Sequence, residues 1–138
     1  MPAERDHAIV LRLTEYSETS QIVTLLTAER GLVRLIAKGA RRSTSKRFAA
    51  GLDLLELGDV AYVPPRGDAQ LGTQTEWVQR DGFLALRREL ARLYAGLYAG
   101  EATVALCEEN DPHPTLYAAL HEHLDALCGE DGGPLFGG

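Results

Sequence analysis

The sequence lacks an apolar run long enough to cross a lipid bilayer. A transmembrane helix needs about 20 consecutive apolar residues, and the 138 residues contain no such run. The opening residues, MPAERDHAIV, carry charges where a secretory signal peptide requires an apolar core. These absences exclude a transmembrane helix and argue against secretion. We therefore expect a cytoplasmic protein with no membrane partner.

Cysteine is scarce, and histidine is not arranged to bind metal. Cys107 and Cys128 are the only cysteines, and neither belongs to a Cys-x-x-Cys pair. His121 and His123 are two residues apart on a predicted helix, so their side chains point roughly 200° apart and cannot share one ion. We expect two free thiols in a reducing compartment, no metal site and no cofactor.

The sequence also lacks the common catalytic motifs. It contains no Gly-x-Ser-x-Gly elbow, no phosphate-binding Walker loop and no dinucleotide-binding glycine fingerprint. The adjacent pair Glu108 and Glu109 falls at the end of a predicted helix, where a solvated surface explains it more simply than an acid–base site does. We expect no catalytic residues and a protein that is not an enzyme.

Positive charge is absent from the last third of the chain. No Lys or Arg follows Arg92, whereas eight Asp and Glu do. The net charge is -6, but residues 1–50 carry +4 and residues 51–138 carry -10. A polyanion should therefore bind the first half of the chain and be repelled by the second.

One segment holds much of the positive charge that is present. Residues 38–48 (KGARRSTSKRF) contain five of the fourteen Lys and Arg and no carboxylate. Their hydroxyl groups and small residues suit contact with phosphates. The candidate DNA-binding residues are Lys38, Arg41, Arg42, Lys46 and Arg47, with Arg34 on the preceding strand assisting and Arg12 and Arg30 nearby in sequence. A solvated loop without a ligand remains the alternative.

Aromatic residues are missing from the strands that flank this basic segment. Residues 20–38 contain no Phe, Tyr or Trp; Tyr16 and Phe48 are the only aromatics near the segment, and Tyr62 and Trp77 could equally be core residues. Base stacking is therefore expected to be minor, and contact with the phosphate backbone to dominate. Such a site would ignore base sequence and accept single- and double-stranded DNA. If all five cations met phosphates, log K against log salt would have a slope of about -3 to -5.

The pattern of apolar residues predicts a β-barrel. Short β-branched segments bounded by turn residues predict strands at residues 7–14, 20–28, 32–38, 52–63 (interrupted, with a candidate bulge at Gly58) and 71–78. Gly31 is expected at a tight turn with positive φ. The near-continuous apolar character of residues 22–26 and 32–37 predicts strands covered on both faces. Five short strands with tight connections fit a small closed barrel of the OB-fold type.

The periodicity becomes helical after Asp81. Leu86, Leu90, Leu93 and Leu97 predict one helix that begins at Asp81, and a second helix is predicted from Pro114 to near Gly129. The fold class is thus a β-barrel plus α: a five-stranded OB-fold followed by a small helical region. We expect an OB-fold nucleic-acid-binding domain at residues 1–79. Residues 80–138 are expected to start a C-terminal helical domain that is truncated in this chain.

Two stretches of the sequence resemble a known family. The run AIVLRLTEYSETSQIVTLLTAERG, followed by LIAKGARRSTSKRF, resembles the N-terminal part of the bacterial recombination mediator RecO. The Thr75-Glu76 pair and the start of the second helix are also similar. The resemblance implies an OB-fold that binds single- and double-stranded DNA through Lys38, Arg41, Arg42, Lys46 and Arg47, with Arg34 assisting, and a nucleoid-associated location. Many RecO proteins carry a four-cysteine zinc site, which Cys107 and Cys128 do not match.

The resemblance also implies partners. RecO proteins anneal complementary strands and act with RecR to displace single-strand-binding protein so that RecA can load. We therefore expect DNA and RecR as direct partners, with single-strand-binding protein and RecA as indirect ones. Two rival hypotheses remain: an adaptor that docks RecR with little DNA binding of its own, and an RNA-binding OB module.

Overall fold

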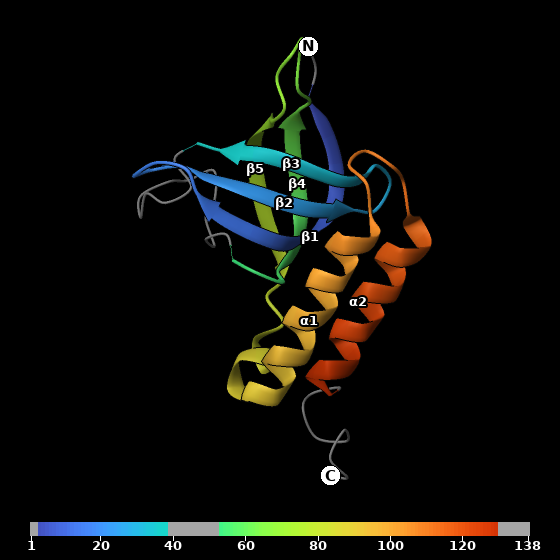
Figure 1. Ribbon diagram of the computed structural model, residues 1–138. Helices are drawn as coiled ribbons and strands as arrows, with labels where there is room; N and C mark the ends of the chain where they lie inside the picture. Colours follow the sequence, from blue (N-terminus) through green and yellow to red (C-terminus); the bar gives the residue numbers. More distant parts are fainter. Residues whose placement is uncertain (1–2, 39–52, 130–138) are drawn as a thin grey trace.

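The structure is a computed structural model that describes residues 3–38 and 53–129 (Figure 1). Five strands form a closed barrel with neighbours in the order β1-β2-β3-β5-β4, all antiparallel except β3 and β5. The strands are β1 (Glu4–Glu15), β2 (Gln21–Thr27), β3 (Gly31–Ala37), β4 (Leu57–Val63) and β5 (Gly72–Asp81). A short 3₁₀ helix η1 (Leu84–Arg88) and two helices, α1 (Leu90–Leu106) and α2 (Pro114–Cys128), follow. The predicted barrel with a small helical region is confirmed.

Strands β1 to β3 are apolar on both faces because the molecule has two cores. Successive side chains of a strand point to opposite faces. The barrel interior contains Ala8, Val10, Val23, Leu25, Val33, Leu35, Ala37, Val60, Tyr62 and Trp77. The space between the barrel wall and the helices contains Ile9, Leu11, Leu26, Leu32, Leu55, Phe83, Leu86, Leu120 and Leu124. The predicted two-sided burial is confirmed, and Tyr62 and Trp77 are core residues.

The β2–β3 turn joins the barrel to the helical pair. Gly31 has φ 77°, as expected for this turn. The Thr27 hydroxyl closes the turn, donating to the Gly31 carbonyl (2.7 Å) and accepting from the Arg30 N–H (2.9 Å). A Cβ on Gly31 would lie 2.2 Å from the carbonyl oxygen of Asp111, in the α1–α2 connection. The Asn110 N–H also donates to the Leu32 carbonyl (2.7 Å). The barrel and the helical pair therefore meet backbone to backbone.

The fourth strand is shorter than predicted. It begins at Leu57, and the chain just before it is a turn in which Leu55 has φ 64°. Leu55 donates its N–H to the Val10 carbonyl (2.7 Å), and its side chain enters the core beside the helices. The expected bulge is confirmed, since the pairing of β4 with β5 shifts register between Leu57 and Gly58.

The first helix begins later than predicted. The Asp81 carboxylate accepts the Phe83 N–H (2.8 Å), Phe83 has φ 47°, and η1 follows. Glu89 is then extended (φ -134°, ψ 126°) before α1 starts. This break places Phe83 and Leu86 in the second core. The second helix matches its predicted bounds, ending at Gly129 in the left-handed conformation. In the described part of the chain, neither helix is long and apolar enough to cross a bilayer.

Candidate nucleic-acid interface

The predicted basic segment starts where β3 ends. Lys38 directly follows β3 and is exposed. The other four loop cations, Arg41, Arg42, Lys46 and Arg47, lie in residues 39–52, outside the described residues. The segment that contains these cations therefore begins after Lys38, at the end of β3, and ends before Asp53, which precedes β4.

An exposed aromatic residue lies at the same end of the barrel as Lys38. Glu15 of β1 pairs with Gln21 of β2, and Gln21 pairs with Ala37 of β3. Neighbouring strands are about 4.8 Å apart, so the residues after Glu15 and Ala37 emerge close together. They are Tyr16, which is 60% exposed, and Lys38. OB-folds bind oligonucleotides on the face of strands 2 and 3 and through the β1–β2 and β4–β5 loops. Tyr16 lies in the first of these loops, and Lys38 directly follows strand 3.

Arg34 lies on β3 and has a carboxylate neighbour. It is half-buried, four residues before Lys38, which follows the strand in a turn. Arg34 Nη1 lies 3.9 Å from Glu109 Oε2, and both side chains are about 40% exposed (40% and 43%). Arg34 also lines a cavity of about 290 Å³ together with Tyr62 and Pro64. Its guanidinium therefore has a loose ion-pair partner from the α1–α2 connection.

Arg12 and Arg30, which are near the basic segment in sequence, both pair with carboxylates. Arg12 donates from Nη2 (2.8 Å) and Nε (3.1 Å) to Glu101, which ties β1 to α1. The hydrogen bonds and charge of this pair raise the pKa of Arg12 and lower the pKa of Glu101. Arg30 lies 2.9 Å from Glu4 and 3.1 Å from Asp6. Both cations are near the basic segment in sequence, and in the structure each is paired with carboxylates.

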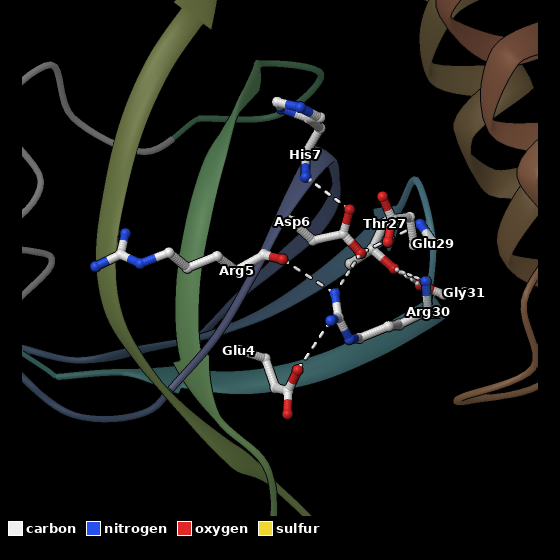
Figure 2. A network of polar contacts seen from close by, with 8 residues as sticks. All are labelled: Glu4, Arg5, Asp6, His7, Thr27, Glu29, Arg30 and Gly31. Atoms are coloured by element: carbon white, nitrogen blue, oxygen red, sulfur yellow. Dashed lines mark hydrogen bonds and ion pairs between the residues drawn. The ribbon is translucent and has the colours of Figure 1, made fainter. Parts of the chain in front are cut away.

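Figure 2 shows the network around Asp6, which sequence reasoning missed. The Asp6 side chain is only 1% exposed and accepts the backbone N–H groups of His7 (2.8 Å) and Glu29 (3.1 Å) and the Arg30 guanidinium (3.1 Å). Arg30 donates in addition to the Arg5 carbonyl (3.0 Å). The network fastens the β2–β3 turn to β1. No local pattern marks it, because Asp6 and Arg30 are 24 residues apart.

Few cations are left without an acidic partner. Within residues 3–38 and 53–129, only Lys38, Arg66 and Arg88 form no ion pair. Arg66 is exposed in the β4–β5 connection, one of the loops through which OB-folds bind ligands, and was not among the predicted site residues. Arg88 lies on η1, beside the helices. Lys38 and Arg66 are therefore the described cations best placed for a polyanion on the barrel.

Two family models match the chain. "Recombination protein O N terminal" matches residues 1–83, and "Recombination protein O C terminal" matches residues 87–137. The chain belongs to the RecO family. This confirms the resemblance drawn from the sequence, and it agrees with the expectation that the chain is not an enzyme, because RecO is a non-enzymatic recombination mediator.

Relatives with this family name cover most of the chain. The chain is 40% identical over 123 residues to the DNA repair protein RecO of Rhodopirellula baltica. This alignment covers 89% of the chain and 45% of the relative. The chain is 42% identical over 124 residues to the protein of the same name from Salinibacter ruber (89% and 46%). It is 40% identical over 126 residues to that of Anaeromyxobacter sp. strain K (91% and 48%). The chain spans about half the length of these curated RecO relatives.

Proposed function

We propose that the chain binds DNA through backbone phosphates, using Lys38, Arg41, Arg42, Lys46 and Arg47. The observation that carries this proposal is the position of the basic segment. Five cations without a carboxylate follow β3 of an OB-type barrel in a RecO-family chain, and the first of them, Lys38, is exposed and has no ion pair among the described residues. Phosphate contacts carry no base information, so binding is independent of sequence and includes single and double strands.

The mechanism of this binding is charge neutralisation. Cations between two phosphate backbones lower their repulsion, so that complementary strands anneal. In the DNA repair pathway that we propose, RecR binds the barrel. RecA then loads onto the DNA after single-strand-binding protein has been removed. Arg34 contributes less than the segment does, because it must first leave Glu109. That cost is small, since an exposed ion pair is worth about 0–1 kcal/mol.

Fluorescence anisotropy with labelled single-stranded and duplex oligonucleotides over a series of salt concentrations tests the proposal. We expect a log–log slope of about -3 to -5 for the wild type, and Lys38→Ala should reduce its magnitude by about 1 on every sequence. Changing all five cations to Ala should abolish most binding. Arg88→Ala, which removes an equally unpaired cation on η1, is the matched control and should leave the slope unchanged.

Two outcomes would contradict this function. Undiminished DNA binding by the fivefold variant would mean that the basic segment is not the site. A wild type that captures RecR but binds neither form of DNA at low salt would instead favour the adaptor hypothesis.

A further inference from the structure

One aromatic ring of the barrel is exposed among the described residues. Tyr16 is 60% exposed, whereas Tyr62 and Trp77, the other aromatic residues in the described strands and their connections, are 4% and 1% exposed and lie in the barrel interior. Single exposed apolar side chains are common on protein surfaces. The surroundings of Tyr16 therefore decide whether its ring can bind a ligand.

Tyr16 lies in the β1–β2 loop, close to the start of the basic segment. Glu15, Gln21 and Ala37 are register partners across β1, β2 and β3. Two strand spacings, about 10 Å, therefore separate the ends of β1 and β3, which Tyr16 and Lys38 directly follow. Figure 1 shows the β1–β2 loop and the end of β3 on the same side of the barrel, away from the two helices. Neighbouring nucleotides of one strand can thus reach both side chains.

The β1–β2 loop is held in place by its own hydrogen bonds. The Tyr16 and Ser17 N–H groups both donate to the Ser20 carbonyl (3.1 and 3.2 Å). The Ser17 hydroxyl accepts the N–H groups of Thr19 (3.4 Å) and Ser20 (3.2 Å). Because the loop is already ordered, a ligand that contacts Tyr16 pays little of the entropy that ordering a loop costs.

The loop also places a carboxylate near the ring. Glu18 is exposed and forms no ion pair within the described ranges. A phosphate beside Glu18 would be repelled, whereas the face of a base is uncharged and stacks on an aromatic ring. The loop therefore favours an unpaired base, with the phosphates of the same strand directed toward Lys38. The bases of a duplex are stacked inside it, so a duplex gains nothing from Tyr16.

We propose, on the basis of the DNA-binding function above, that Tyr16 stacks on one unpaired base while Glu18 disfavours a duplex, so that the site prefers single-stranded to double-stranded DNA. Phosphate contacts remain the larger part of the binding of either form, as the shortage of aromatic residues in the sequence predicts. The preference concerns strandedness and not base sequence, because every base has a face that can stack.

Fluorescence anisotropy with a labelled single strand and the corresponding duplex, over a series of salt concentrations, tests the role of Tyr16. Tyr16→Leu should weaken binding of the single strand about tenfold, which corresponds to about 1.4 kcal/mol, and leave duplex binding unchanged. The salt slope should stay the same, because no cation is removed. Tyr98→Leu, at a 79% exposed tyrosine of α1, is the matched control and should change neither affinity.

A tryptophan substitution gives a direct reading of stacking. Tyr16→Trp should keep the preference for the single strand, and the emission of the new indole should be quenched by single-stranded but not by duplex DNA. Trp77, the only native tryptophan, is 1% exposed in the barrel interior and should not respond. Quenching of equal size by both forms of DNA would contradict stacking on an unpaired base.

Neutralising Glu18 tests the contribution of its charge. Glu18→Gln should strengthen duplex binding about threefold and single-strand binding less. Glu122→Gln removes the same charge from an exposed position of α2 and is the matched control. Equal effects of the two changes would mean that only the net charge of the chain matters and that Glu18 has no specific role.

The outcomes separate this preference from the DNA-binding function on which it rests. If the wild type binds DNA but Tyr16→Leu binds the single strand as the wild type does, or loses affinity for both forms equally, Tyr16 is not a stacking residue and the DNA-binding function still stands. A wild type that binds neither form would overturn that function and the preference together. Far-ultraviolet circular dichroism confirms that each variant is folded.

Discussion

Two buried carboxylates in the barrel wall have opposite electrostatic surroundings. Asp6 faces the Arg30 guanidinium and two backbone N–H groups. Glu56 is 5% exposed and accepts from Trp77 Nε1 (3.1 Å) and Gln79 Nε2 (2.8 Å), but forms no ion pair with a cation in the described residues. Burial therefore raises the pKa of Glu56. The charge on Asp6 supports the fold, whereas the charge on Glu56 opposes it.

Asp6→Ala should destabilise the protein by about 2–4 kcal/mol, because it leaves the His7 and Glu29 N–H groups without their acceptor and removes the buried partner of the Arg30 guanidinium. Urea unfolding measures the loss. Glu4→Ala removes the other, more exposed carboxylate bound to Arg30 and should cost at most about 1 kcal/mol. Equal effects of the two changes would show that the Asp6 network does not hold the turn.

Glu56→Gln should raise the melting temperature at neutral pH. The pKa of Glu56 is higher in the folded than in the unfolded chain, so the folded state binds its proton more tightly. This contribution to stability is complete below the unfolded value of about 4.3 and is lost as pH rises through the folded pKa. The advantage of the neutral variant should therefore shrink on acidification. Melting curves from acid to neutral pH measure it, with Glu76→Gln at an exposed site of β5 as control; an advantage that does not change with pH would refute the assignment.

At the scale of elements, the packing of the two helices against the barrel depends on the β2–β3 turn. Gly31→Ala should destabilise the protein by more than about 3 kcal/mol, because its Cβ would overlap the Asp111 carbonyl oxygen at 2.2 Å. Gly67 has a similar positive φ (57°) but open space around it, so Gly67→Ala should cost only about 1 kcal/mol of backbone strain. Comparing the denaturant midpoints of the two variants separates the cost of backbone strain, which both share, from the cost of the steric overlap with Asp111, which only Gly31→Ala has. If the two losses were equal, the contact with Asp111 would contribute nothing.

Elements governed by local signals could be predicted from the sequence, and those governed by distant packing could not. The Gly31 turn and the second helix follow from turn and capping residues a few positions apart. The breaks at Leu55 and Phe83 put bulky residues in left-handed conformations (φ 64° and 47°) that local preference disfavours. Both side chains enter the core between barrel and helices, so tertiary burial overrides propensity there.

The candidate site shows the same division. The clustering of five cations is a property of eleven consecutive residues, so the sequence reveals it. The pairing of Arg12 with Glu101 joins residues 89 positions apart, and the proximity of Glu109 to Arg34 likewise depends on how the helices dock. The sequence could therefore propose Arg34 as a contact but could not show which carboxylate competes for it.

At the scale of the molecule, the barrel and the helices share one of the two cores, so we expect them to unfold together. Trp77, the only tryptophan, reports on the barrel interior, and ellipticity at 222 nm reports chiefly on α1 and α2. The two signals should give one coincident transition. Leu124→Ala, in the shared core, should shift both by about 2–5 kcal/mol. Two separate transitions would mean that residues 1–79 and the helical region are independent domains.

The shared core also has a consequence for synthesis on the ribosome. The outer barrel wall, with Ile9, Leu11 and Leu26, is covered only when Leu120 and Leu124 are in place. At about 5–20 residues per second, the 46 residues from Phe83 to Cys128 take roughly 2–9 s to be made. For that interval the nascent barrel exposes an apolar wall to solvent. Chaperones that hold exposed apolar surface should therefore engage this chain after its strands are complete and release it once α2 has emerged.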